Sequence, residues 1–125
     1  MPETETADKK FQRELNAGTV SLILLSVLGR AGEPLYGYQI LKQIEARGAD
    51  LPMMKQGALY PVLRSLERLR LLTSRVEPSV SGPPRRYYAI TDAGRAALGR
   101  WTSIWRRNRD FVEGVLEGDY DVGSR

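Results

Sequence analysis

The chain has 125 residues, the length of a single domain, and its hydrophobic fraction of 42% is ordinary for a globular protein. Cysteine and histidine are absent, which excludes disulfides, thiolate and imidazole catalysis and Cys/His zinc sites, so we expect no metal and no cofactor. Eleven cations face three acids between Lys55 and Arg107, and this net charge of +8 indicates a polyanion-binding surface, whereas residues from Asp110 onward carry −4.

The N-terminal third predicts a tail followed by one long helix. Residues 1–9 are polar without apolar periodicity, so we expect a disordered tail. A helix is predicted from Lys9 or Lys10 to Leu28, with Gly29 as its stop. Its segment from residue 20 onward is apolar nearly all round, which predicts the central helix of the fold. The same run is too short to span a bilayer, so we expect a cytoplasmic protein that does not enter membranes.

Two further helices are predicted after a loop over Arg30–Leu35. The first covers about Tyr36–Ala46, and Leu51–Met53 is a candidate for a short extended segment. The second covers about Lys55–Leu69 and is amphipathic. Its apolar face contains Leu59, Val62, Leu63, Leu66 and Leu69, and its opposite face contains Gly57, Tyr60, Pro61, Arg64 and Arg68. Pro61 lies too deep in this helix for the favoured first position and removes one backbone hydrogen bond.

The remainder of the chain predicts a hairpin and a long last helix. The strands cover Leu72–Glu77 and Arg85–Ile90, and a turn-rich tip joins them over Pro78–Pro84. Thr91 is expected to cap a helix that covers residues 92–117. Gly118 would end this helix, and residues 118–125 are expected to be a flexible tail.

This order predicts a mainly α fold with a small β-hairpin, namely a winged helix-turn-helix over residues 10–91 and a C-terminal dimerisation helix over 92–117. The third helix would then lie in the major groove of double-stranded DNA, and the hairpin wing would reach the flanking backbone or minor groove. The predicted DNA contacts are Tyr36, Lys55, Gln56, Tyr60, Pro61, Arg64, Arg68, Arg85, Arg86 and Tyr87.

Three stretches of the sequence resemble the PadR family of phenolic acid decarboxylase regulators. They are Tyr36–Ile40 (YGYQI), Gly57–Leu69 (GALYPVLRSLERL) and Gly82–Gly94 (GPPRRYYAITDAG), and the resemblance extends over about residues 17–116. It implies a dimeric bacterial repressor that binds a palindromic operator and is often released by a small molecule. The family's tyrosine-proline pair corresponds to Tyr60 and Pro61. The wing departs from the usual glycine run, because Pro83 and Pro84 follow Gly82, which implies a stiffer tip.

The last helix has an apolar stripe that predicts a homodimer interface. Its members are Leu98, Trp101, Ile104, Trp105, Asn108, Phe111, Val112 and Val115, and Phe11 and Leu15 of the first helix are expected to join it. Drug-sensing relatives stack planar ligands on a tryptophan at the position of Trp105, so the resemblance implies a small aromatic or cationic effector near Trp105 and Trp101. The other interpretation is that both rings are ordinary interface core.

Two other functions have to be weighed against a DNA-binding regulator. A winged helix used for protein contacts would also display arginines, but mutation of Arg64 and Arg68 would then leave DNA affinity unchanged. An enzyme is disfavoured because the sequence has no paired carboxylates, no glycine-rich phosphate loop, and neither His nor Cys.

Overall fold

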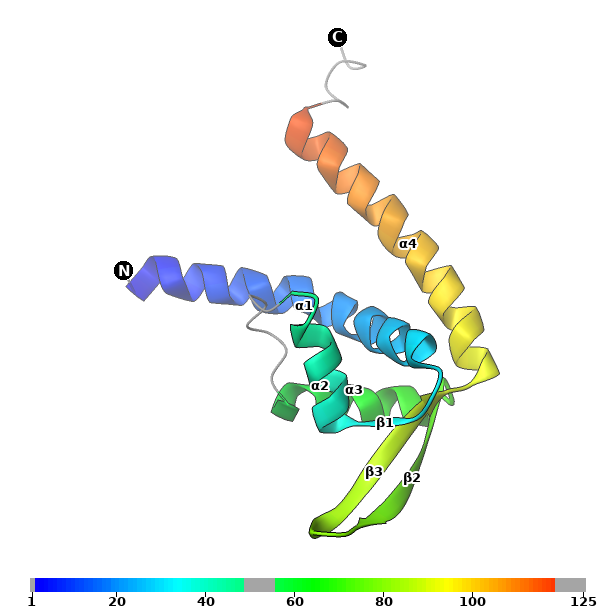
Figure 1. Cartoon of the computed structure of the whole chain (residues 1–125). Helices are drawn as coiled ribbons and strands as arrows, with labels where there is room; N and C mark the ends of the chain where they lie inside the picture. The colour runs from blue at the N-terminus through cyan, green and yellow to red at the C-terminus, as the bar shows by residue number, and fades with distance from the viewer. Residues whose placement is uncertain (1, 49–55, 119–125) are drawn as a thin grey trace.

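The computed structural model describes residues 2–48 and 56–118 and confirms a mainly helical fold with a small sheet (Figure 1). The elements in chain order are α1 (Pro2–Ala31), β1 (Leu35–Tyr36), α2 (Gly37–Glu45), α3 (Gln56–Arg68), β2 (Leu72–Ser79), β3 (Gly82–Ile90) and α4 (Asp92–Glu117). Leu51–Met53, Lys55 and residues 119–125 lie outside the described residues. Within the described ranges, no helix is both long and apolar enough to cross a membrane.

Helix α1 is longer at both ends than predicted. The expected tail is wrong for residues 2–9, which are helical, because a polar segment needs no apolar face to extend a helix that is anchored further along. An ion pair one turn apart supports this part, with Lys10 Nζ lying 2.6 Å from Glu14 Oε2. Gly29 does not stop the helix. The chain turns at Gly32 instead, whose φ of 71° is left-handed.

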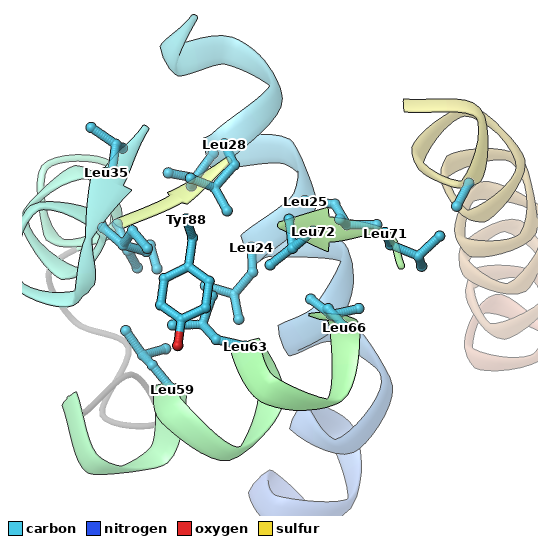
Figure 2. Packing of buried hydrophobic residues seen from close by; sticks show 14 residues of the cluster. Leu24, Leu25, Leu28, Leu35, Leu59, Leu63, Leu66, Leu71, Leu72 and Tyr88 are labelled. Atoms are coloured by element: carbon cyan, nitrogen blue, oxygen red, sulfur yellow. The ribbon is translucent and has the colours of Figure 1, made fainter. Parts of the chain in front are cut away.

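The core surrounds the second half of α1, as its apolar sequence predicts. Leu24, Leu25 and Leu28 are at most 2% exposed, and α1 packs against α2, α3, α4 and β3. Figure 2 shows the ring of Tyr88 directed from β3 toward α3, with its hydroxyl end near Leu59 and Leu63. One continuous apolar cluster therefore fixes the position of α3 relative to the sheet.

The sheet is antiparallel with strand order β1-β3-β2, and its hairpin projects from the domain as a wing (Figure 1). The strands continue further than predicted, so the tip is the turn at residues 80–81 rather than Pro78–Pro84. Prolines are tolerated here because the pairing is already irregular between Glu77 and Ser79. Strand β1 was not predicted. It pairs Leu35 with Tyr88 and Tyr36 with Tyr87.

Helix α4 begins and ends where the sequence predicts. The Thr91 hydroxyl accepts a hydrogen bond from the Gly94 backbone at 2.9 Å and donates to the Arg70 carbonyl at 2.8 Å. Gly118 closes the helix with a φ of 78°. The C-terminal half of α4 and the N-terminal half of α1 both extend away from the core (Figure 1), which leaves their apolar side chains without a covering layer in the protomer.

Candidate nucleic-acid interface

Helix α3 has one buried and one exposed face. Leu59, Leu63 and Leu66 are at most 2% exposed, so this face anchors the helix in the core. Leu69 was predicted to belong to the same face, but it is 61% exposed. Leu69 follows Arg68, the last residue of the helix, and the chain turns at Arg70 with a left-handed φ of 65°, so Leu69 lies at the exposed end of α3.

The exposed face of α3 is the basic face that the sequence predicts. Gly57, Pro61, Arg64 and Arg68 are all exposed, and Pro61 lies inside the helix. Among the residues that the structure describes, neither Arg64 nor Arg68 pairs with a carboxylate. A guanidinium free to reach outward offers the planar donor pattern that phosphates and guanine edges accept.

Tyr60 has a packing role that the sequence did not indicate. The residue is half-buried and packs against the core, and its hydroxyl lies close to Gly37 at the start of α2. A Cβ added to Gly37 would be 2.6 Å from this oxygen, so only glycine allows the approach without a shift. The contact between Tyr60 and DNA stays a prediction. Its packing against Gly37 helps to set how α2 and α3 meet.

Aromatic rings and cations form a cluster where the wing leaves the domain. The Tyr36 and Tyr87 rings meet edge to face with centroids 5.3 Å apart, and the Arg85 guanidinium lies 4.5 Å from the Tyr36 ring centroid. Tyr38 stacks beside Tyr36 at 6.5 Å, and Lys42 Nζ lies 5.4 Å from the Tyr38 ring. Sequence reasoning missed Tyr38 and Lys42. The YGY spacing and a lysine one turn later were the available signals.

Each of the three acids between Lys55 and Arg107 has a stabilising interaction within the protomer. Glu67 accepts a hydrogen bond from Ser74, Glu77 pairs with Arg75 on the same strand, and Asp92 lies in the first turn of α4, where the helix dipole favours a negative charge. Within residues 2–48 and 56–118, no carboxylate pairs with Arg64 or Arg68 of α3. Of the eleven cations in this stretch, five lie on α3 and the wing, and four lie on α4.

Tyr88 lies beneath the surface of α3 and the wing and buries its phenol group. It is 1% exposed, and burial raises the pKa of its phenol, an effect that nearby Arg86 opposes and Glu67 reinforces. Its partner across the hairpin is Ser74. The side chains that join α3 to the wing thus lie above a neutral, well-packed ring.

A groove of about 470 Å³ lies between α1 and α4. Its lining residues are Glu14, Leu15, Gly18, Thr19, Leu22, Trp101, Ile104, Trp105 and Asn108. Trp101 packs against the core of its own protomer, whereas Trp105 is 41% exposed and has the Arg109 guanidinium 5.3 Å from its ring centroid. The two tryptophans therefore have different environments, and only Trp105 offers a large accessible surface.

The predicted dimer stripe divides into two parts. Leu98 and Trp101 pack against the core of the protomer and are already partly buried by it. The exposed apolar members are Phe11, Leu15, Ile104, Trp105, Phe111, Val112 and Val115, together with Leu116, which was not predicted. Asn108 is also exposed and borders the groove.

Two predicted DNA contacts cannot be placed in this surface. Lys55 lies outside the described residues, and for Gln56 only the backbone is described, at the first position of α3. The remaining members lie on α3, β3 or β1, which lie together at the lower end of the molecule in Figure 1. Arg86 is exposed but is bonded to Ser74 at 3.0 Å.

Comparison with known proteins identifies the same architecture in bacterial regulators. Residues 24–100 match the transcriptional regulator PadR-like family. A PadR family transcriptional regulator from Eggerthella lenta is 32% identical with a TM-score of 0.77, covering 94% of this chain and 98% of that one. A PadR-like transcriptional regulator from Bacillus cereus is 25% identical with a TM-score of 0.66, covering 82% and 96%.

A relative from Lysinibacillus sphaericus, described only as an uncharacterized protein, is 29% identical over 83 residues, which is 66% of this chain and 76% of the relative. The family match spans more than half of the chain and includes α2, α3, the wing and the start of α4. The fold, the basic face of α3 and the sequence of this chain all agree with this family. The protein is a member of the PadR-like family of DNA-binding transcriptional regulators, not an enzyme.

Proposed function

We propose that this regulator is a homodimeric repressor that binds a palindromic operator with α3 in the major groove and the wing on the flanking backbone. The observation that carries the proposal is the exposed basic face of α3, where Arg64 and Arg68 have no carboxylate partner among the described residues, beside a wing that also carries Arg85. One surface then presents cations at two places along a duplex.

The proposed homodimer follows from the apolar surface of the extended helices. Phe11, Phe111 and Leu116 are 64%, 68% and 77% exposed, so an isolated protomer would expose large apolar side chains on the extended parts of both α1 and α4. A second copy would bury these side chains and place two α3 helices on one duplex. Reading of both half-sites needs a spacing of about one DNA turn, roughly 34 Å.

The proposed effector is a small aromatic or cationic molecule at Trp105. The ring is 41% exposed and lines the groove, so its π surface is open to a planar or cationic group, which would share the ring with the Arg109 guanidinium or displace it. Helix α4 lines the groove and also carries the apolar stripe of the proposed dimer interface. A ligand in the groove would therefore change the spacing of the two α3 helices in the dimer. Release from the operator is the expected consequence.

The first test is fluorescence anisotropy with the DNA upstream of the protein's own gene against a scrambled duplex, titrated with salt. We expect preferential binding to the upstream DNA with two subunits per site. In Arg64→Ala, the slope of log K against log salt concentration should become shallower by about 0.9 per protomer. Equal weak binding to both duplexes, unchanged by Arg64→Ala, would favour a protein-contact module. A promoter-reporter strain distinguishes repression from activation.

The dimer and effector need separate measurements. Light scattering should give twice the chain mass, and Phe111→Asp should shift it to the monomer, with Glu113→Lys as a charge-changing control on the same turn. Titration with a planar aromatic cation should quench tryptophan fluorescence in the native chain and less in Trp105→Leu. Binding that leaves operator affinity unchanged would contradict release by this ligand.

A further inference from the structure

A chain of hydrogen bonds connects the recognition helix to both strands of the wing. The Ser74 hydroxyl on β2 donates to Glu67 Oε2 on α3 at 2.6 Å, and Arg86 Nη1 on β3 donates to the Ser74 oxygen at 3.0 Å. Three elements are thus joined through one hydroxyl group. We refer to Glu67, Ser74 and Arg86 as the α3–wing connection.

The connection lies on the face of the hairpin that turns toward α3. Ser74 pairs with buried Tyr88 across the strands, and Arg86 points to the same side as Tyr88 because it is two residues earlier on β3. Further out, Val76 and Val80 are 52% and 106% exposed, so the distal wing has no core of its own. Its direction is therefore set near its base.

The opposite face of the hairpin is held in another way. There Tyr87 contacts the Tyr36 ring edge to face, and Arg85 lies over the same ring. Aromatic contacts permit sliding more readily than short hydrogen bonds in a fixed donor-acceptor order do. The α3–wing connection adds a directional attachment between the wing and the helix to the apolar packing beneath it.

We infer that Glu67 and Ser74 are positioning residues for DNA binding, and that Arg86 acts with them to hold the wing rather than as a phosphate contact. The inference rests on the proposed function, because it concerns a duplex that α3 and the wing bind together. Prior ordering of the wing removes part of the entropy that binding would otherwise cost. The Ser74 hydroxyl also gives the Glu67 carboxylate a hydrogen-bond donor within the protomer.

Ser74→Ala is the decisive variant because it breaks both hydrogen bonds without changing any charge. We expect the hairpin amides of the free protein to exchange hydrogen about three- to tenfold faster, since a hydrogen bond of this kind contributes within that range. Affinity for duplex DNA should fall by a similar factor with an unchanged salt slope. Ser74→Thr keeps the hydroxyl and should restore both values.

Thr73→Val is the matched control. Thr73 is the neighbouring residue on β2, its side chain is on the other face of the hairpin, and the substitution removes a hydroxyl while keeping a β-branched shape. It should leave exchange and affinity near the native values. Native exchange and affinity in Ser74→Ala would overturn the inference.

Arg86→Gln tests the role of the arginine. If Arg86 has a positioning role, Arg86→Gln should lower duplex affinity by the same factor as Ser74→Ala and leave the salt slope unchanged. Combining the two substitutions should then cause no further loss of affinity. A slope that falls by about 0.9 per protomer would show a direct phosphate contact and overturn this assignment. Hydrogen exchange needs no DNA, so failure of the native protein to bind a duplex would count against the proposed function and leave the measured rigidity of the wing as a separate result.

Discussion

Gly37→Ala is expected to destabilise this protein although alanine is the better helix former. A Cβ at position 37 would lie 2.6 Å from the Tyr60 hydroxyl oxygen and 3.0 Å from its Cζ, well inside ordinary contact. Overpacking of this kind costs about 1–3 kcal/mol, and the gain in helix propensity is at most about 1 kcal/mol. We expect a net loss of about 1–2 kcal/mol and a Tm lower by about 5–10 °C in thermal unfolding followed by circular dichroism.

A double-mutant cycle shows whether the close approach is the cause. Tyr60→Phe removes the nearest atom, so Gly37→Ala should cost less in that background than in the native chain. Gly99→Ala is the control, because nothing lies within 4 Å of its added Cβ and it should be neutral or stabilising. If Gly37→Ala matches native stability, or if Tyr60→Phe gives no relief, the contact does not constrain α2 against α3.

Three further predictions concern the core, the cap of α4 and the buried phenol. Leu63→Ala should lower the free energy of unfolding by about 2–5 kcal/mol in urea titrations, whereas Leu69→Ala, at a 61% exposed site, should change it by less than about 0.5 kcal/mol. Thr91→Ala should cost about 1 kcal/mol because its hydroxyl caps α4, and Thr91→Ser should recover most of this loss if the cap is the cause. Burial raises the pKa of Tyr88, so its contribution to stability is complete below pH 10.0 and is lost as the pH rises through the folded-state pKa. The native chain should therefore lose stability relative to Tyr88→Phe above pH 10.0, and parallel pH profiles would refute this linkage.

The parts of the fold that sequence reasoning predicted correctly are those with strong local signals. The apolar half of α1, the amphipathic α3 and the Thr91 cap each follow from periodicity or from one capping residue. The start of α1 was misplaced because residues 2–9 have no apolar stripe to indicate a helix. Helical propensity alone does not show whether a segment continues a helix anchored elsewhere.

In the candidate site too, features with local sequence signals were predicted and features that depend on tertiary contacts were not. The residue types and their order predicted a basic α3 face and a wing, and Arg64 and Arg68 are exposed as expected. The sequence could not show that Tyr60 packs against Gly37, or that Arg86 is bonded to Ser74, because these partners are 23 and 12 residues apart along the chain. Tyr38 and Lys42 were missed although their contacts are local, because only the fold shows that Tyr36 meets β3 beside them.

By itself, the sequence determined the class of the protein: periodicity, charge distribution and motifs specify a winged helix with a basic recognition helix and one long C-terminal helix. The tertiary structure decided which side chains are committed within the protomer and which are left for partners. Leu98 and Trp101 are used by the core, whereas Trp105 and Phe111 are exposed. The physical reason is that periodicity identifies the apolar face of a helix, but only the position of neighbouring elements determines how far along that face the core extends.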